Sequence, residues 1–129
     1  MEKNIENFDI LNQTKKAVPD LPFLEIKETI LDKNYNLSLV FPDEKLAEEL
    51  HIKWKEKTGP ANILSFPLEK DSGEIFISLK QAEKESVKKE ITMEDYLKYL
   101  FIHGCLHLKG LKHSDIMDKE EDKFMKMFS

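Results

Sequence analysis

The chain is predicted to fold as a single α+β domain. Short segments with alternating apolar residues, typical of strands, are interspersed with longer segments in which apolar residues recur at helical spacing. With 129 residues, 40% hydrophobic content and no internal repeat or low-complexity segment, the chain is long enough for one core and gives no sign of a second. We therefore expect one domain spanning residues 1–129.

The first half of the chain is expected to contain two strands and two helices. Residues 5–11 form the first predicted strand, and residues 21–31 carry apolar positions at helical spacing. Residues 36–41 alternate leucine or phenylalanine with other residues, which is typical of a strand. A proline and an aspartate then predict the start of a short helix over residues 42–50.

Two further strands are expected over residues 62–66 and 74–79. The segment between them contains the triplet Asp71-Ser72-Gly73, which is typical of a turn, so the two strands should pair as a hairpin. Glutamine and charged residues follow, and they predict a surface helix that ends near Lys89.

The next helix is the most apolar one. Thr92, with Asp95 three residues later, resembles a capping box and predicts a helix that begins near Met93. From residue 96 to 108 this helix carries only Lys98 as a formally charged side chain, so we expect it to be buried on most sides. A last helix over residues 117–128, with methionine and phenylalanine at helical spacing, is expected to be a packing cover.

Three of the four histidines are spaced as metal ligands. His103 and His107 lie four residues apart and so share one face of the buried helix, where their imidazoles can converge on one ion. Gly110 can take the left-handed conformation that ends a helix, which would let His113 turn back as a third ligand. Three neutral nitrogen donors suit zinc, one ion per chain, and leave a fourth position for water, as in catalytic sites.

This helix allows two other interpretations. Histidines on an apolar helix are often core residues with a single hydrogen bond, although the third histidine and the glycine must then coincide by chance. The same spacing also occurs in the zinc-peptidase motif H-E-x-x-H-x-x-G-x-x-H, but Gly104 stands where that motif has its glutamate general base. Cys105 lies about 200° round the helix from His103 and is expected to be a small buried side chain.

Two segments of the chain resemble signatures of one family, the YbeY family of bacterial metal-dependent endoribonucleases, which mature ribosomal RNA. The first segment, similar to H-G-x-L-H-L-x-G-Y-D-H, is His103-Gly104-x-Leu106-His107-Leu108-x-Gly110-x-x-His113. The second, similar to P-T-[DN]-V-L-S-F-P and a later G-D-[IL], is Pro60-Ala61-Asn62-Ile63-Leu64-Ser65-Phe66-Pro67 with Gly73-Glu74-Ile75. The resemblance covers positions 37 to 128, and the histidine motif is its more specific part.

The resemblance implies a fold, an activity and partners. The fold would be a zincin-like mixed sheet, mainly parallel with one antiparallel edge strand, packed on helices around a buried metal-bearing helix. The activity would be that of a single-strand-specific, zinc-dependent endoribonuclease in small-subunit rRNA 3′-end processing, with the rRNA precursor and the ribosome as partners. Attack on the phosphate by metal-bound hydroxide and attack by the ribose 2′-hydroxyl both remain open.

Lys55 and Ser65 are the candidate catalytic residues beside the metal. Lys55 falls where the family carries an arginine, in a chain that has no arginine at all, and it would meet a phosphate as a point charge. The Ser65 hydroxyl and its strand's backbone would hold the substrate beside the ion, and Asn62 offers an amide of similar use. For Ser65 and Asn62, a purely structural role is an equal alternative.

Two other classes of function remain open. One is a zinc-stabilised, ribosome-associated binding protein without turnover, which the lysine at position 55 favours and the open fourth metal position disfavours. The other is a metallopeptidase-like hydrolase, in which Glu74 or Asp115 would have to replace the missing base.

Charge and composition bear on the partners and the compartment. The net charge of −5 opposes RNA binding, but Lys53, Lys55 and Lys57 precede the second motif, and Lys109 and Lys112 flank the metal histidines. With one cysteine, no signal-type N-terminus and no run of eighteen apolar residues, we expect a cytoplasmic protein that has no membrane partner.

Overall fold

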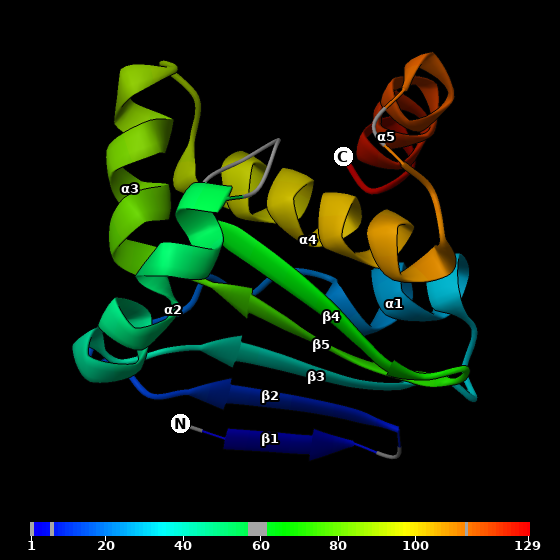
Figure 1. The fold of residues 1–129 in the computed structure, drawn as a ribbon. Helices are drawn as coiled ribbons and strands as arrows, with labels where there is room; N and C mark the ends of the chain where they lie inside the picture. The colour runs from blue at the N-terminus through cyan, green and yellow to red at the C-terminus, as the bar shows by residue number, and fades with distance from the viewer. Residues whose placement is uncertain (1, 6, 57–61, 113) are drawn as a thin grey trace.

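The computed structural model describes the backbone of residues 2–5, 7–56, 62–112 and 114–129, and the side chains of 7–50, 62–112 and 114–129. Across this part of the chain the strands form a five-stranded sheet in the order β1-β2-β3-β5-β4, with helices packed on it (Figure 1). The strands are β1 (Glu2–Ile5), β2 (Phe8–Asn12), β3 (Asn36–Phe41), β4 (Ile63–Glu69) and β5 (Ser72–Ile77).

The sheet is mixed, as predicted. β3 pairs in parallel with both β2 and β5, and β4 pairs antiparallel with β5 at one edge. This confirms the α+β class, the predicted hairpin and the antiparallel edge strand.

The other edge differs from the prediction of one strand over residues 5–11. The chain makes two strands there, because Asn7 takes a φ of 65° and turns β1 back along β2, with Ile5 opposite Phe8. Asparagine adopts this left-handed conformation more readily than most residues. The sheet therefore has an antiparallel strand at each edge.

The predicted helices are all present, with shifted ends. They are α1 (Phe23–Leu31), α2 (Glu44–Glu56), α3 (Leu79–Lys88), α4 (Met93–Lys109) and α5 (Asp115–Met127). α2 continues past the predicted end at Leu50, because residues 51–56 contain no glycine or proline to stop it. Within the described residues, no helix is both long and apolar enough to cross a membrane.

Both ends of α4 are set by the residues that the sequence indicated. The Thr92 hydroxyl accepts a hydrogen bond from the Asp95 backbone N–H at 3.0 Å, which caps the first turn. Gly110 ends the helix with a φ of 110°, and its N–H and that of Leu111 bond back to the carbonyls of His107 and Leu106. This pair of bonds is a Schellman motif.

α4 lies across the sheet and contacts α1, α3, α5, β4 and β5 (Figure 1). Its most buried side chains, each fully covered, are Leu97, Leu100, Phe101, Ile102 and Cys105. On the opposite face of β4, Leu64 and Leu50 of α2 form a second, smaller cluster. The expectation of a buried central helix is confirmed.

α5 covers α4 less completely than predicted. Met117 and Phe124 are buried and Phe128 packs at the edge of the core, but Met127 is 53% exposed. At the far end of α5, the Nζ atom of Lys98 donates to the Phe128 carbonyl at 2.9 Å. The one charged residue predicted within the buried helix thus binds the C-terminus of α5.

Candidate metal centre

His103 and His107 face the same point from successive turns of α4. Their ring centroids are 4.5 Å apart at an interplanar angle of 80°, and their Nε2 atoms are 3.0 Å apart. His103 is only 4% exposed, whereas His107 is half-buried. The predicted convergence of the two imidazoles is therefore present.

Each imidazole is held through its other nitrogen. The Nδ1–H group of His107 donates to the backbone carbonyl of Leu111 at 3.1 Å, on the far side of the Gly110 turn. The Nδ1–H group of His103 donates to the carboxylate of Glu121 on α5. Histidines that bind metals are oriented by the same two kinds of acceptor, a carboxylate or a backbone carbonyl.

These bonds determine which nitrogens carry hydrogen. A carbonyl and a carboxylate accept from Nδ1–H, so in the neutral rings the Nε2 atoms of His103 and His107 carry lone pairs. The two Nε2 atoms lie 3.0 Å apart, at hydrogen-bond distance, so a single proton or a single metal cation could be shared between them. The donor set and its orientation fit zinc, which is bound by neutral imidazole nitrogen.

The third predicted ligand, His113, lies outside the described residues. Among the residues whose placement is described, no group of three or more histidine, cysteine, aspartate or glutamate side chains is arranged to hold a metal. Cys105 is fully buried in the core, and this burial raises the pKa of its thiol. It remains a packing residue, as expected.

Gly104 brings α4 into close contact with the hairpin. A Cβ atom at this position would lie 2.9 Å from Ile63 Cδ1 and 3.0 Å from Ile75 Cδ1. A glutamate here, as in the zinc peptidases, would require the Ile63 and Ile75 side chains to shift. The glutamate base of the zinc peptidases is therefore absent from the sequence and disfavoured by the packing at this position.

The two other candidates for a peptidase base lie on β5 and α5. Glu74 precedes the buried Ile75 on β5, so its side chain lies on the face of the sheet turned away from α4. Asp115 is exposed in the first turn of α5.

Ser65 lies against α4 beside Gly104, and its hydroxyl contacts the protein. Its Oγ atom donates to the Gly104 carbonyl at 3.4 Å, one residue from His103. Asn62 is buried, and its side-chain N–H donates to the Tyr96 hydroxyl at 3.1 Å. The structure thus gives both residues bonds to α4, and a substrate role for Ser65 stays a prediction.

Lys55 lies on the last turn of α2, and its side chain is outside the described part of the chain. Its predicted contact with a phosphate is therefore not tested. Lys109 and Lys112, which follow His107 in the chain, are both exposed.

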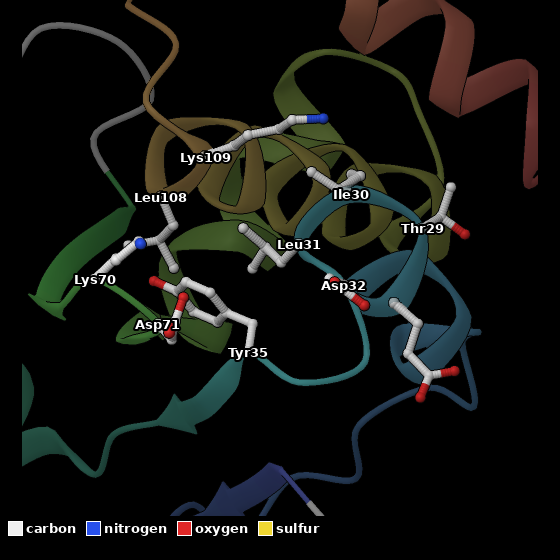
Figure 2. A pocket seen from close by; sticks show the side chains of 10 residues that line it. Thr29, Ile30, Leu31, Asp32, Tyr35, Lys70, Asp71, Leu108 and Lys109 are labelled. Atoms are coloured by element: carbon white, nitrogen blue, oxygen red, sulfur yellow. The ribbon is translucent and has the colours of Figure 1, made fainter.

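An open pocket of about 510 Å³ lies at the C-terminal end of α4, and neither His103 nor His107 lines it. Figure 2 shows Leu31, Tyr35 and Leu108 pointing toward one another within it. Its rim carries both signs of charge, including Asp32 and Lys109, so it is not a selective site for an anion. The convergent imidazoles, and not this pocket, mark the candidate centre.

Glu121 is the site residue that sequence reasoning missed. It stands in a mostly acidic run, where solvation is the ordinary expectation, yet it is only 7% exposed. The available signal was its spacing, because it follows Met117 by four residues and precedes Phe124 by three, and both are core residues. A charge on the apolar side of an amphipathic helix indicates a specific partner.

Comparison with known proteins supports one family. A family model described as Endoribonuclease YbeY matches residues 2–129. The endoribonuclease YbeY of Agrobacterium fabrum is 37% identical over 94 residues, which are 66% of this chain and 56% of that protein. The protein of the same name from Buchnera aphidicola is 31% identical over 141 residues, covering 97% of this chain and 91% of its own.

A solved structure agrees with the fold. The solution structure of TM1509 from Thermotoga maritima is similar with a TM-score of 0.61 and 26% sequence identity, over 92% of this chain and 87% of that one. The similarity in sequence and in structure thus extends over nearly the whole chain.

Proposed function

The chain belongs to the endoribonuclease YbeY family, and on that premise we propose that it is a single-strand-specific, zinc-dependent endoribonuclease acting in small-subunit rRNA 3′-end maturation. The observation that carries the proposal is the pair of imidazoles on α4, whose Nε2 lone pairs converge at 3.0 Å. The rRNA precursor, the small ribosomal subunit and the cytoplasm are its proposed partners and compartment.

The proposed metal ligands are His103, His107 and His113, holding one zinc ion per chain. The Nδ1 bonds of His103 and His107 support this role, and so does the positive φ at Gly110, where α4 ends. Bound zinc would supply Lewis-acid stabilisation of charge on the scissile phosphate.

The chain's own residues would position the RNA. β4 is an edge strand beside α4, and Ser65 lies on it within 3.4 Å of the backbone that carries His103. A nucleotide backbone laid along this edge would reach the imidazoles and the Ser65 hydroxyl together. Lys55 would meet the phosphoryl oxygens as a point charge and neutralise charge that develops on them.

Cleavage of a defined RNA tests the activity. Purified protein should cut a single-stranded RNA spanning the 3′ end of small-subunit rRNA when zinc is supplied, and leave a base-paired RNA of the same sequence intact. His107→Ala protein is the matched control for a contaminating nuclease. Equal cleavage by both proteins would remove the assignment.

The same reaction decides the route of attack. A 2′,3′-cyclic phosphate on the upstream fragment would indicate attack by the ribose 2′-hydroxyl, whereas water attack leaves no cyclic product. Identifying the new 3′ end by mass spectrometry separates the two.

A ribosome-associated binding protein without turnover is the second candidate, favoured by lysine at position 55 in place of the family's arginine. Chelation of zinc distinguishes it. A binding protein would lose its fold and its ribosome association together, whereas the enzyme would lose turnover and keep its fold.

A further inference from the structure

We propose that Glu121 is a positioning residue that holds His103 in the tautomer and orientation needed for metal binding, and so makes the docking of α5 part of the site. This inference rests on the metal role proposed for His103. It concerns a residue in the last helix that neither sequence motif includes.

The contact between Glu121 and His103 is buried on both sides. The side chains are 9% and 5% exposed, and the carboxylate oxygen Oε2 accepts from Nδ1–H. Removing a carboxylate from water is costly unless a specific partner compensates it. His103 is that partner, although the two residues are 18 positions apart in the chain.

The packing of α5 on α4 fixes the position of Glu121 relative to His103. The Ser114 hydroxyl caps the start of the helix by accepting from the Met117 backbone N–H at 3.3 Å. Met117 and Phe124 then bury the same side of the helix on either side of Glu121. Lys98 binds the Phe128 carbonyl at the other end, so α5 is held against α4 along its length.

The effect of Glu121 on the ligand follows from charge. A carboxylate that accepts from Nδ1–H fixes the hydrogen on that nitrogen and makes Nε2 a stronger donor to a metal. The Leu111 carbonyl orients His107 in the same way but carries no charge. Glu121 should therefore contribute more to metal affinity than its distance from the ion suggests.

A conservative pair of variants tests this role. Glu121→Gln keeps the shape of the side chain but removes the charge, and its amide can donate as well as accept, so it no longer selects one tautomer. Asp122→Asn makes the same change of charge at the next residue, which is exposed. Both variants are measured as full-length protein, without and with zinc.

The metal-free measurement is long-range ¹H–¹⁵N NMR of the imidazoles. Wild type and Asp122→Asn should show His103 with hydrogen on Nδ1, and Glu121→Gln should show the Nε2–H tautomer appearing. Unchanged His103 signals in Glu121→Gln, or an Nε2–H tautomer in the wild type, would overturn the proposal. This readout holds whether or not zinc is the physiological metal.

The second measurement is zinc affinity by competition with a chelator. Loss of an outer partner of this kind typically lowers metal affinity by about 10- to 100-fold, and we expect that loss for Glu121→Gln. Asp122→Asn should stay within about twofold of wild type, as exposed substitutions do. If Glu121→Gln lowers the melting temperature but binds zinc as tightly as wild type, Glu121 serves only to pack α5, and the proposal is wrong. If the wild-type protein itself does not bind zinc, the result counts against the proposed function instead.

Discussion

The two histidines of α4 are held by different regions of the molecule. His107 depends on the turn directly after it, where Gly110 places the Leu111 carbonyl against Nδ1. His103 depends on a separate helix, through the Glu121 carboxylate. Two histidines one helical turn apart thus rely on a local backbone feature in one case and on tertiary docking in the other.

The difference predicts that replacing His103 destabilises the fold more than replacing His107 does. The turn at Gly110 is exposed and local, so disturbing it should leave the core intact. The α4–α5 contact is buried and long-range, so disturbing it should reach the whole domain.

The largest contrast is expected between His103→Ala and His107→Ala. Removing His103 leaves the buried Glu121 carboxylate without its hydrogen-bond partner, which typically costs about 1–3 kcal/mol and more where the group is charged, so His103→Ala should be strongly destabilised. Replacing the half-buried His107 should lower the free energy of unfolding by about 1 kcal/mol or less. Urea unfolding measures both, and elemental analysis should show metal lost in each; equal loss of stability would contradict the comparison.

Gly104→Glu, which gives the same helix the peptidase pattern, should have the second-largest effect on stability. The side chain must displace Ile63 and Ile75 and bury a carboxylate between α4 and the hairpin, at a cost of about 3 kcal/mol or more. Thermal denaturation and a peptidase assay check this expectation. A stable variant that cleaves peptides would show that the helix can lift from the sheet.

Gly110→Val should have a smaller effect that is confined to the turn. No atom lies within 4 Å of a Cβ atom at Gly110, so the expected cost is only the backbone strain of φ 110°, about 1–2 kcal/mol. Zinc affinity should fall because the Leu111 carbonyl moves away from His107. Asparagine tolerates this conformation better than valine, so Gly110→Asn should recover part of the zinc affinity. Identical zinc affinities in wild type and both variants would show that the conformation of the turn does not affect metal binding.

The smallest effect on stability is expected for Lys55→Ala, which touches neither histidine region. We expect zinc content and melting temperature near those of wild type, because substitutions away from buried groups stay within about 0.5 kcal/mol. Cleavage of single-stranded RNA at saturating substrate should nevertheless slow, and Lys55→Arg should keep or raise the rate. Equal rates for Lys55→Ala and wild type would leave catalysis to the metal centre alone.

Much of the fold was predictable because its signals are local. Thr92 and Gly110 mark the ends of α4 through hydrogen bonds within a few residues, and the alternation over β3 depends on adjacent positions. The convergence of His103 and His107 follows from helix geometry alone. These features need no knowledge of what packs where.

The sequence by itself therefore determined the helix that carries the histidines and their shared face. Tertiary structure decided what lies against that face: Glu121 from α5, the close approach of the hairpin at Gly104, and the order in which β5 enters between β3 and β4. The physical reason is range. Periodicity and caps describe a residue's near neighbours in the chain, whereas a buried carboxylate is understood only when the partner that compensates its desolvation is in place.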